Sequence, residues 1–133
     1  MQKVNPTQTK AWKALQAHFE DIKDVKMKNL FEDQSRAEAF TLKWEDFYVD
    51  YSKNRITEET KTLLLDLAKE MNLEEAKAAY FGGAAINETE DRAVMHTALR
   101  QPSTASVTID GEDVIPEVNA VKEKIKGFCD TVI

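Results

Sequence analysis

Histidine and cysteine are the side chains that most often supply acid–base or nucleophilic chemistry near neutral pH, and this chain has two His and one Cys. Neither His18 nor His96 has another His or Cys three or four positions away, the spacing that would place two metal ligands on one helical face. Cys129 falls on an apolar stripe, where a free Cys usually packs as a small hydrophobic residue. We therefore interpret all three as structural residues.

Two acidic clusters have side chains that could bind a cation. Glu88, Glu90 and Asp91 fall at the start of a predicted helix, where carboxylates commonly interact with the unpaired backbone N–H groups of the first turn. The stretch DGED at residues 110–113 lacks the ligand spacing of a calcium-binding loop. We interpret the first cluster as part of a helix start and the second as part of a turn, and we predict no metal site.

Three other short patterns resemble functional motifs. Gly82-Gly83 follows a predicted helix, whereas a phosphate cradle lies between a strand and a helix N-terminus. Residues 87–89 match the N-glycosylation pattern, but nothing in the sequence implies secretion. Residues 53–55, Lys-Asn-Arg, could bind an anion together, although polar residues are common in connectors. From the residues alone we predict no catalytic, substrate-binding, cofactor-binding or metal-binding site.

Composition narrows the class of protein. The chain has 133 residues, which fits one domain, and its 18 Lys and Arg against 24 Asp and Glu give a net charge of −6. This acidic balance argues against a nucleic-acid partner, because phosphate binding depends on clustered basic residues. No apolar run approaches the ~20 residues of a membrane span, and the start of the chain lacks the apolar stretch of a signal peptide. We therefore expect no membrane partner and a cytoplasmic location.

The spacing of apolar residues predicts a mainly α-helical chain with a small β-hairpin, an α+β fold. Trp12, Leu15 and Phe19 recur at helical spacing, and longer apolar stripes follow in the second half of the chain. We expect helices over residues 7–22, 57–71, 73–81, 90–100 and 116–132, with shorter helical pieces near residues 27–31 and 35–39. The expected N-caps are Thr7, Ser35, Thr57, Asn72 and Thr89. Glu75, three positions after Asn72, suggests a capping box there.

The hairpin is predicted over residues 40–51, where the apolar period changes from helical to alternating. Its alternating apolar residues are Phe40, Leu42, Trp44, Phe47, Val49 and Tyr51. Two strands alone are marginally stable in water, so we expect the hairpin to lie on a helix or to join a larger sheet.

Three stretches of this sequence resemble one enzyme family. Residues 49–57 (VDYSKNRIT), 86–100 (INETEDRAVMHTALR) and 110–121 (DGEDVIPEVNAV) are similar to segments of the glucose-6-phosphate isomerases, in the family's order and spacing. The opening at residues 5–19 (NPTQTKAWKALQAHF) also resembles the start of bacterial members. Met95 stands where the family usually has Leu, and Gln101-Pro102 replaces a more common Asn. These four stretches together span nearly the whole chain.

The resemblance implies a function and a larger fold. The family interconverts glucose 6-phosphate and fructose 6-phosphate without a cofactor, in glycolysis and gluconeogenesis, by acid–base proton transfer through an enediol(ate). Its members are homodimers with two α/β sandwich domains of the sugar-isomerase (SIS) type. The family's catalytic residues and its loop for the sugar phosphate lie downstream of the matching region. We therefore carry no catalytic residue over to this chain.

The similarity covers only the N-terminal segment of the family. The chain ends at Ile133 in helical register, without a capping glycine or a polar tail, which indicates a fragment. We expect residues 1–133 to form an N-terminal segment that is inactive alone and that covers and braces the catalytic core. The alternative is an acidic helical protein-interaction module with no enzymatic activity.

Overall fold

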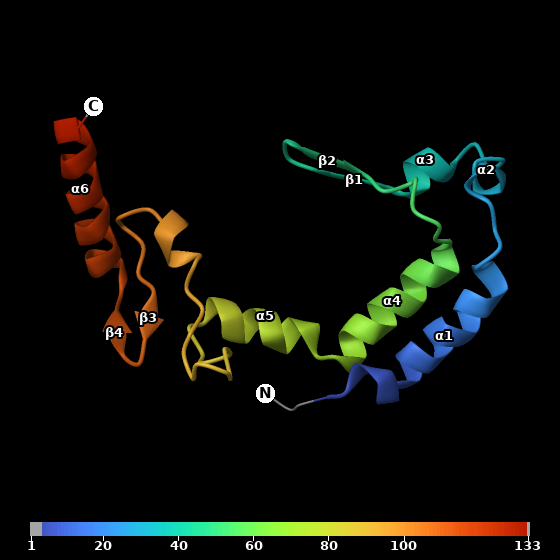
Figure 1. Ribbon diagram of the computed structural model, residues 1–133, viewed down its shortest axis with the longest axis horizontal. Helices are drawn as coiled ribbons and strands as arrows, with labels where there is room; N and C mark the ends of the chain where they lie inside the picture. The colour runs from blue at the N-terminus through green and yellow to red at the C-terminus, as the bar shows by residue number, and fades with distance from the viewer. Residues whose placement is uncertain (1–3, 133) are drawn as a thin grey trace. The chain divides into compact units, whose positions relative to one another are not determined.

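A computed structural model describes residues 4–132, so the predictions about the first three residues and about Ile133 lie outside the described range. The described residues form two compact units, one over residues 4–71 and one over residues 72–132 (Figure 1). The length fits one domain and does not indicate this division into two units. The boundary falls at Asn72, whose left-handed backbone (φ 53°) separates two consecutive helices.

An antiparallel helix pair is the main packing element of residues 4–71. Helix α1 (Lys10–Ile22) packs along α4 (Glu58–Glu70), and both lie side by side in Figure 1. The Glu70 carboxylate, at the end of α4, accepts hydrogen bonds of 2.9 and 3.1 Å from the backbone N–H groups of Lys10 and Ala11. The last residue of one helix therefore caps the start of the other.

The start of α1 differs from the sequence prediction. A short 3-10 helix, η1 (Pro6–Gln8), precedes α1, and the Asn5 side chain accepts the backbone N–H of Thr7. Thr9, and not Thr7, is the N-cap of α1, because its Oγ1 accepts the backbone N–H of Trp12 at 3.1 Å. The proline at the start of η1 favours this separate turn, since it fixes φ and has no N–H to donate.

Two short helices and a hairpin connect α1 to α4. The helices are α2 (Met27–Leu30) and α3 (Arg36–Ala39), and the strands are β1 (Thr41–Trp44) and β2 (Phe47–Asp50). Ser35 makes no side-chain cap on α3. Instead the Asp33 carboxylate accepts hydrogen bonds from both the backbone and the hydroxyl of Ser35. The predicted mainly helical fold with a small hairpin is confirmed.

The hairpin has two chemically different faces. Its strands are antiparallel, with Leu42 opposite Val49 and Trp44 opposite Phe47. Successive side chains of a strand point to opposite faces, so these four apolar residues share one face. The other face carries Thr41, Lys43, Tyr48 and Asp50. A two-residue turn joins the strands, and Glu45 adopts a left-handed backbone there (φ 48°).

Residues 72–132 contain two helices and a minimal hairpin. Helix α5 (Leu73–Phe81) has the bounds that the sequence predicted, and the long helix α6 (Ile115–Val132) starts one residue earlier than expected. Asn72 makes no side-chain cap, so the predicted capping box with Glu75 does not form. Strands β3 (Thr108–Ile109) and β4 (Glu112–Asp113) are joined by Asp110-Gly111, both with positive φ, as a two-residue type I′ turn requires.

The prediction of a helix over residues 90–100 is wrong. Only Ala98–Arg100 is helical there, as the 3-10 helix η2, and an isolated bridge pairs Asn87 with Arg92. The Asn87 side chain donates to Glu90 and accepts from the Thr89 hydroxyl, so Thr89 does not cap a helix. Asp91 has a left-handed backbone (φ 49°). Such local side-chain bonds compete with helix formation, and one left-handed residue interrupts the helical ladder.

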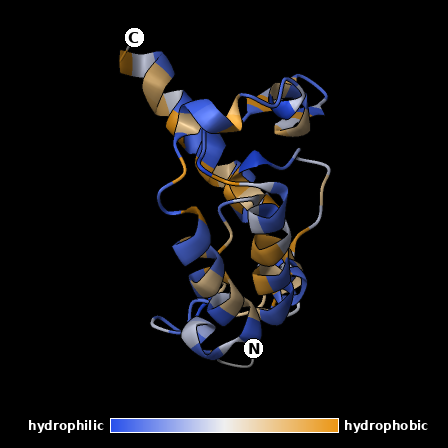
Figure 2. Cartoon of the chain, turned by 90° about the vertical axis from the view of Figure 1, so that its right-hand side faces the viewer, coloured by the Kyte–Doolittle hydropathy of each residue, from blue (hydrophilic) through white to orange (hydrophobic). Residues whose placement is uncertain are grey.

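Few of the described residues are fully buried. The buried hydrophobic side chains are Ala11, Phe40, Ala98 and Ile115, and the buried polar ones are Thr9, His18, Arg36, Ser52 and Thr60. Hydrophobic and hydrophilic residues alternate along the helices in Figure 2, and many large apolar side chains remain exposed. Among the residues described, no helix has the length and apolar character needed to cross a membrane.

Candidate functional site

His18 lies in a buried polar contact between α1 and α4. Its Nε2 and the hydroxyl of Thr60 share a hydrogen bond of 2.7 Å. Thr60 also forms a capping box with Thr57, since each hydroxyl accepts the backbone N–H of the other residue. The His18 Nδ1 lies 3.6 Å from a carboxylate oxygen of the exposed Glu59. These contacts use the imidazole to join the two helices.

Arg36 is a buried side chain that binds three backbone groups of residues 4–71. Its guanidinium donates three hydrogen bonds to backbone carbonyls, at 3.0 Å to Ser52, 3.1 Å to Ile56 and 2.7 Å to Asn54. The ring of Phe40 lies against it, with its centroid 4.5 Å from Cζ. A planar guanidinium suits such a fan of acceptors better than an ammonium does. Arg36 therefore fixes the connector over residues 52–56.

This connector contains the Lys-Asn-Arg stretch that could have bound an anion. Arg55 instead donates to the backbone carbonyl of Lys23 at 3.0 Å, and the Asn54 amide donates to the carbonyl of Tyr51 at 3.0 Å. Two of the three side chains thus serve the protein's own backbone. The structure does not bring residues 53–55 together as an anion-binding group.

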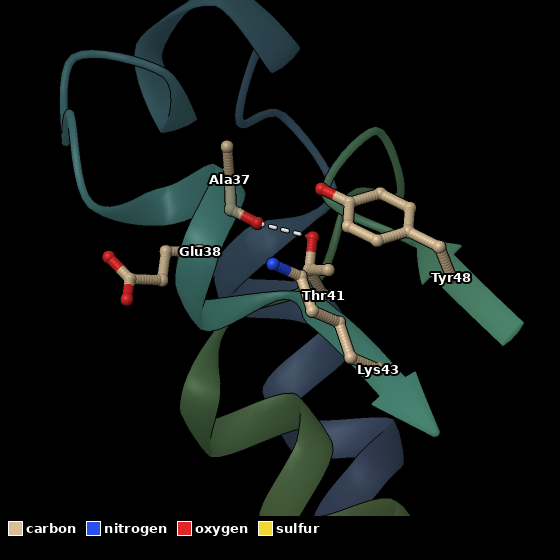
Figure 3. Close-up of a pocket in the computed structure, with 5 residues that line it drawn as sticks. All are labelled: Ala37, Glu38, Thr41, Lys43 and Tyr48. Atoms are coloured by element: carbon tan, nitrogen blue, oxygen red, sulfur yellow. Dashed lines mark hydrogen bonds between the residues drawn. The ribbon is translucent and has the colours of Figure 1, made fainter. Parts of the chain in front are cut away.

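A cavity of about 450 Å³ opens beside the polar face of the hairpin. It is lined by Ala37, Glu38, Thr41, Lys43 and Tyr48, which Figure 3 shows as sticks. The Thr41 hydroxyl donates to the Ala37 carbonyl at 2.6 Å, and the Lys43 ammonium lies 5.4 Å from the centre of the Tyr48 ring. The Thr41 hydroxyl and the Lys43 ammonium thus each contact a group of the protein itself. These contacts do not place a proton donor and a proton acceptor opposite each other across the cavity. We assign it no catalytic role.

His96 lies in the second unit, within residues 90–100, where the sequence predicts a helix and the structure has none at this residue. It is exposed and lines a smaller cavity of about 260 Å³ together with Asn87, Arg92 and Leu99. An isomerase needs a base beside the proton that it moves and a cation near the developing charge. No carboxylate lines this cavity among the described residues. His96 therefore stays a residue for which we predict no catalytic role.

The two acidic clusters differ in what they bind: in the first, Glu90 accepts a hydrogen bond from the Asn87 amide and pairs with Arg92, and in the second a carboxylate binds backbone. The Asp113 carboxylate accepts the backbone N–H groups of Ile115 and Val107, at 3.0 and 3.1 Å, and these bonds lower its pKa below the ordinary 3.8. The Ser52 hydroxyl and backbone N–H likewise lower the pKa of Asp50. Within residues 4–132, no three His, Cys, Asp or Glu side chains are grouped as a metal site would require.

Gly82 and Gly83 end helix α5. Gly83 has a left-handed backbone (φ 77°), and a Cβ there would lie 2.8 Å from the Thr108 carbonyl oxygen. The glycine therefore allows a close approach of β3 to the end of α5, which agrees with a structural role.

Cys129 differs from the sequence interpretation, because the structure leaves its side chain exposed. Four apolar side chains of the same helix are exposed as well: Val121, Ile125, Phe128 and Val132. The stripe exists as the spacing predicted, and the residues of 72–132 leave these four side chains of it exposed. Burial depends on a partner surface as well as on spacing.

Comparisons with known proteins identify the family. The phosphoglucose isomerase family model matches residues 50–133. The chain is also 54% identical, over 134 aligned residues, to a glucose-6-phosphate isomerase of Christiangramia forsetii. This match includes 100% of the chain and 25% of that relative, so the chain spans about a quarter of the relative's length.

The chain belongs to the phosphoglucose isomerase family. The family assignment from the four sequence stretches is confirmed. The alternative of an acidic helical protein-interaction module without enzymatic activity is not favoured by these matches. Sequence reasoning missed Arg36, whose acceptors lie 16 to 20 positions away and leave no local periodic signal.

Proposed function

We propose that this chain is the N-terminal part of an aldose–ketose isomerase that interconverts glucose 6-phosphate and fructose 6-phosphate in glycolysis and gluconeogenesis. The observation that carries the proposal is the 54% identity over the whole chain to a glucose-6-phosphate isomerase. The reaction proceeds by acid–base proton transfer between C1 and C2 of the sugar, through an enediol(ate) and without a cofactor. The sugar phosphate is the substrate of the longer protein.

Within that enzyme, residues 4–132 have a structural role. His18, Arg36 and Asp113 all bind the chain's own helices and backbone, which leaves them unsuited to proton transfer on a sugar. Exposed apolar side chains on the hairpin and on α6 supply surface with which the segment braces the catalytic core. Burying each such Leu- or Phe-sized side chain stabilises a protein by roughly 1.5–3 kcal/mol.

The longer protein is a cytoplasmic homodimer with two SIS-type α/β sandwich domains. This part of the proposal rests on the family resemblance and on the acidic, cysteine-poor composition.

A coupled dehydrogenase assay of fructose 6-phosphate conversion tests the proposal. The 133-residue chain, purified free of host isomerase, should give no turnover above the blank. The full-length protein that contains this chain should be active, and a chelator should leave its rate unchanged. Turnover by the 133-residue chain would overturn the structural role, and an inactive full-length protein would overturn the proposed reaction.

A further inference from the structure

The turn of hairpin β3–β4 combines an exposed aspartate with a following glycine. Asp110-Gly111 is the only place in the sequence where Asp or Asn precedes Gly. Both residues have positive φ, 51° for Asp110 and 88° for Gly111, and both are exposed. A Cβ built on Gly111 would meet no atom within 4 Å. The backbone of this turn is therefore open to solvent.

The backbone nitrogen of Gly111 is free to react. Its N–H donates no hydrogen bond to any group of residues 4–132. Glycine has no Cβ, so no side chain of its own hinders the approach of another atom to this nitrogen. The carboxyl carbon of the preceding Asp110 side chain is within reach, because attack of the nitrogen on Cγ closes a five-membered ring. The two groups of an intramolecular reaction are thus neighbours in the chain.

The paired strands oppose this ring closure, but only weakly. The reaction requires rotation about the Cα–C bond of Asp110, which turns the nitrogen toward Cγ and opens the turn. Strands β3 and β4 have two residues each, and two strands alone are marginally stable in water. The Asp113 carboxylate holds the N–H groups of Val107 and Ile115 at the other end of the hairpin. The turn can therefore open while the start of α6 stays in place.

We propose that Asp110-Gly111 is a site of spontaneous isoaspartate formation. The Gly111 nitrogen attacks Cγ of the protonated Asp110 carboxyl and an N–Cγ bond forms. The proton of the nitrogen and the hydroxyl of the carboxyl leave together as one water, and a succinimide ring results. The inference goes beyond the proposed function and does not depend on it, since the modification requires neither a sugar phosphate nor a longer protein.

Water then opens the ring in one of two ways. Cleavage of the new N–Cγ bond restores aspartate. Cleavage of the original bond between the Asp110 carbonyl carbon and the Gly111 nitrogen leaves the main chain running through Cβ and Cγ, with a free α-carboxylate. This second product is isoaspartate, and its free α-carboxylate is the group that an isoaspartate-specific carboxyl methyltransferase methylates. No oxidant or reductant is needed in either step.

Asp91 is a matched comparison in the same unit. Like Asp110 it is exposed and has a left-handed backbone (φ 49°). Its successor is Arg92, which has a side chain and whose backbone N–H donates to the Asn87 carbonyl at 3.4 Å. Asp91 therefore shares the backbone conformation of Asp110 and lacks the unhindered, unbonded nitrogen.

Peptide mapping by mass spectrometry after incubation of the 133-residue chain tests this proposal. A slightly acidic buffer keeps a larger share of the carboxyl protonated. The methyltransferase marks isoaspartate with a methyl group, and the succinimide is seen as the loss of one water. We expect methylation to increase with time at Asp110 and to stay at its starting level at Asp91. The rate at Asp110 in the folded chain should lie within about tenfold of the rate in urea, because exposed turns open at little cost in free energy.

Asp110→Gly is the variant that removes the reacting carboxyl and keeps the turn, since Gly-Gly also suits a type I′ turn. It should lose the methylation. Three results would overturn the proposal: no isoaspartate at Asp110 in the folded chain, equal amounts at Asp91 and Asp110, or unchanged total methylation in Asp110→Gly. The second result would show that the glycine does not select the site, and the third would place the isoaspartate elsewhere in the chain.

Discussion

The two compact units of this chain differ in how far each buries its own residues. In residues 4–71, five polar residues are buried, and two of them, His18 and Arg36, bond to distant parts of the unit through their side chains. In the described part of residues 72–132, only Ala98 and Ile115 are fully buried. The family model covers the second unit and only the end of the first. Most residues that match the family model thus lie in the second unit, which buries fewer of its own side chains than the first. We expect this of a segment whose surface packs against other parts of a larger protein.

The largest expected effect falls on the first unit. Arg36→Ala removes the donor of three backbone carbonyls, and each buried group left unsatisfied costs about 1–3 kcal/mol, so we expect a loss of about 3 kcal/mol or more in the free energy of unfolding. Urea unfolding followed by circular dichroism measures this change.

Arg55→Ala is the matched control for this variant. Arg55 also donates to a carbonyl, that of Lys23, but its side chain is exposed, so the change should stay within about 0.5 kcal/mol. Equal losses of unfolding free energy in the two variants would show that the buried Arg36 contributes no more to the stability of the first unit than the exposed Arg55 does.

In the second unit we expect a tenfold difference in the rate at which Cys129 is modified, between the 133-residue chain and the full-length protein. Because Cys129 is exposed, a thiol reagent should modify the folded 133-residue chain at a rate within about twofold of the unfolded chain. In the full-length protein, coverage of the α6 stripe should slow the reaction about tenfold. Slow modification of the 133-residue chain would show that the second unit buries its last helix by itself, which would remove the contrast between the units.

The smallest effect is a pH dependence of the second unit. The pKa of Asp113 lies below 3.8 in the folded chain because backbone N–H groups of Ile115 and Val107 bind its carboxylate. Its contribution to stability is therefore present above pH 3.8 and is lost as the pH falls through the lower, folded pKa. Acid unfolding of Asp113→Asn should show a weaker pH dependence than that of the unchanged chain. Asp110→Asn, whose carboxylate makes neither bond, should retain the original dependence.

Local sequence signals predicted most of the fold. The bounds of α5, the cap at Thr57 and the hairpin all follow from apolar spacing and capping residues, which act within a few positions. The prediction of a helix over residues 90–100 failed because its apolar spacing was outweighed by the hydrogen bonds of Asn87 and the left-handed backbone of Asp91. Side-chain competition of this kind is invisible to a count of apolar positions.

The buried hydrogen bonds of His18 and Arg36 could not be predicted from the sequence, for a different reason. The hydrogen bond from His18 joins it to Thr60, 42 positions away, and the fan of bonds from Arg36 depends on where a connector passes. The exposure of Cys129 depends on which surfaces are present to cover α6. Pairings between distant segments and the presence of a covering surface are not encoded in local periodicity.

The cap that Glu70 places on α1 also has a consequence for the time course of synthesis. Its partner Lys10 lies 60 positions earlier, so α1 is made with its local Thr9 cap long before the Glu70 carboxylate exists. At about 5–20 residues per second, the interval without Glu70 lasts roughly 3–12 seconds. An isolated helix as short as α1 is marginal in water over that interval. We therefore expect the α1–α4 pair to be complete only after residue 70 has been made, with the nascent α1 accessible to chaperones and proteases until then.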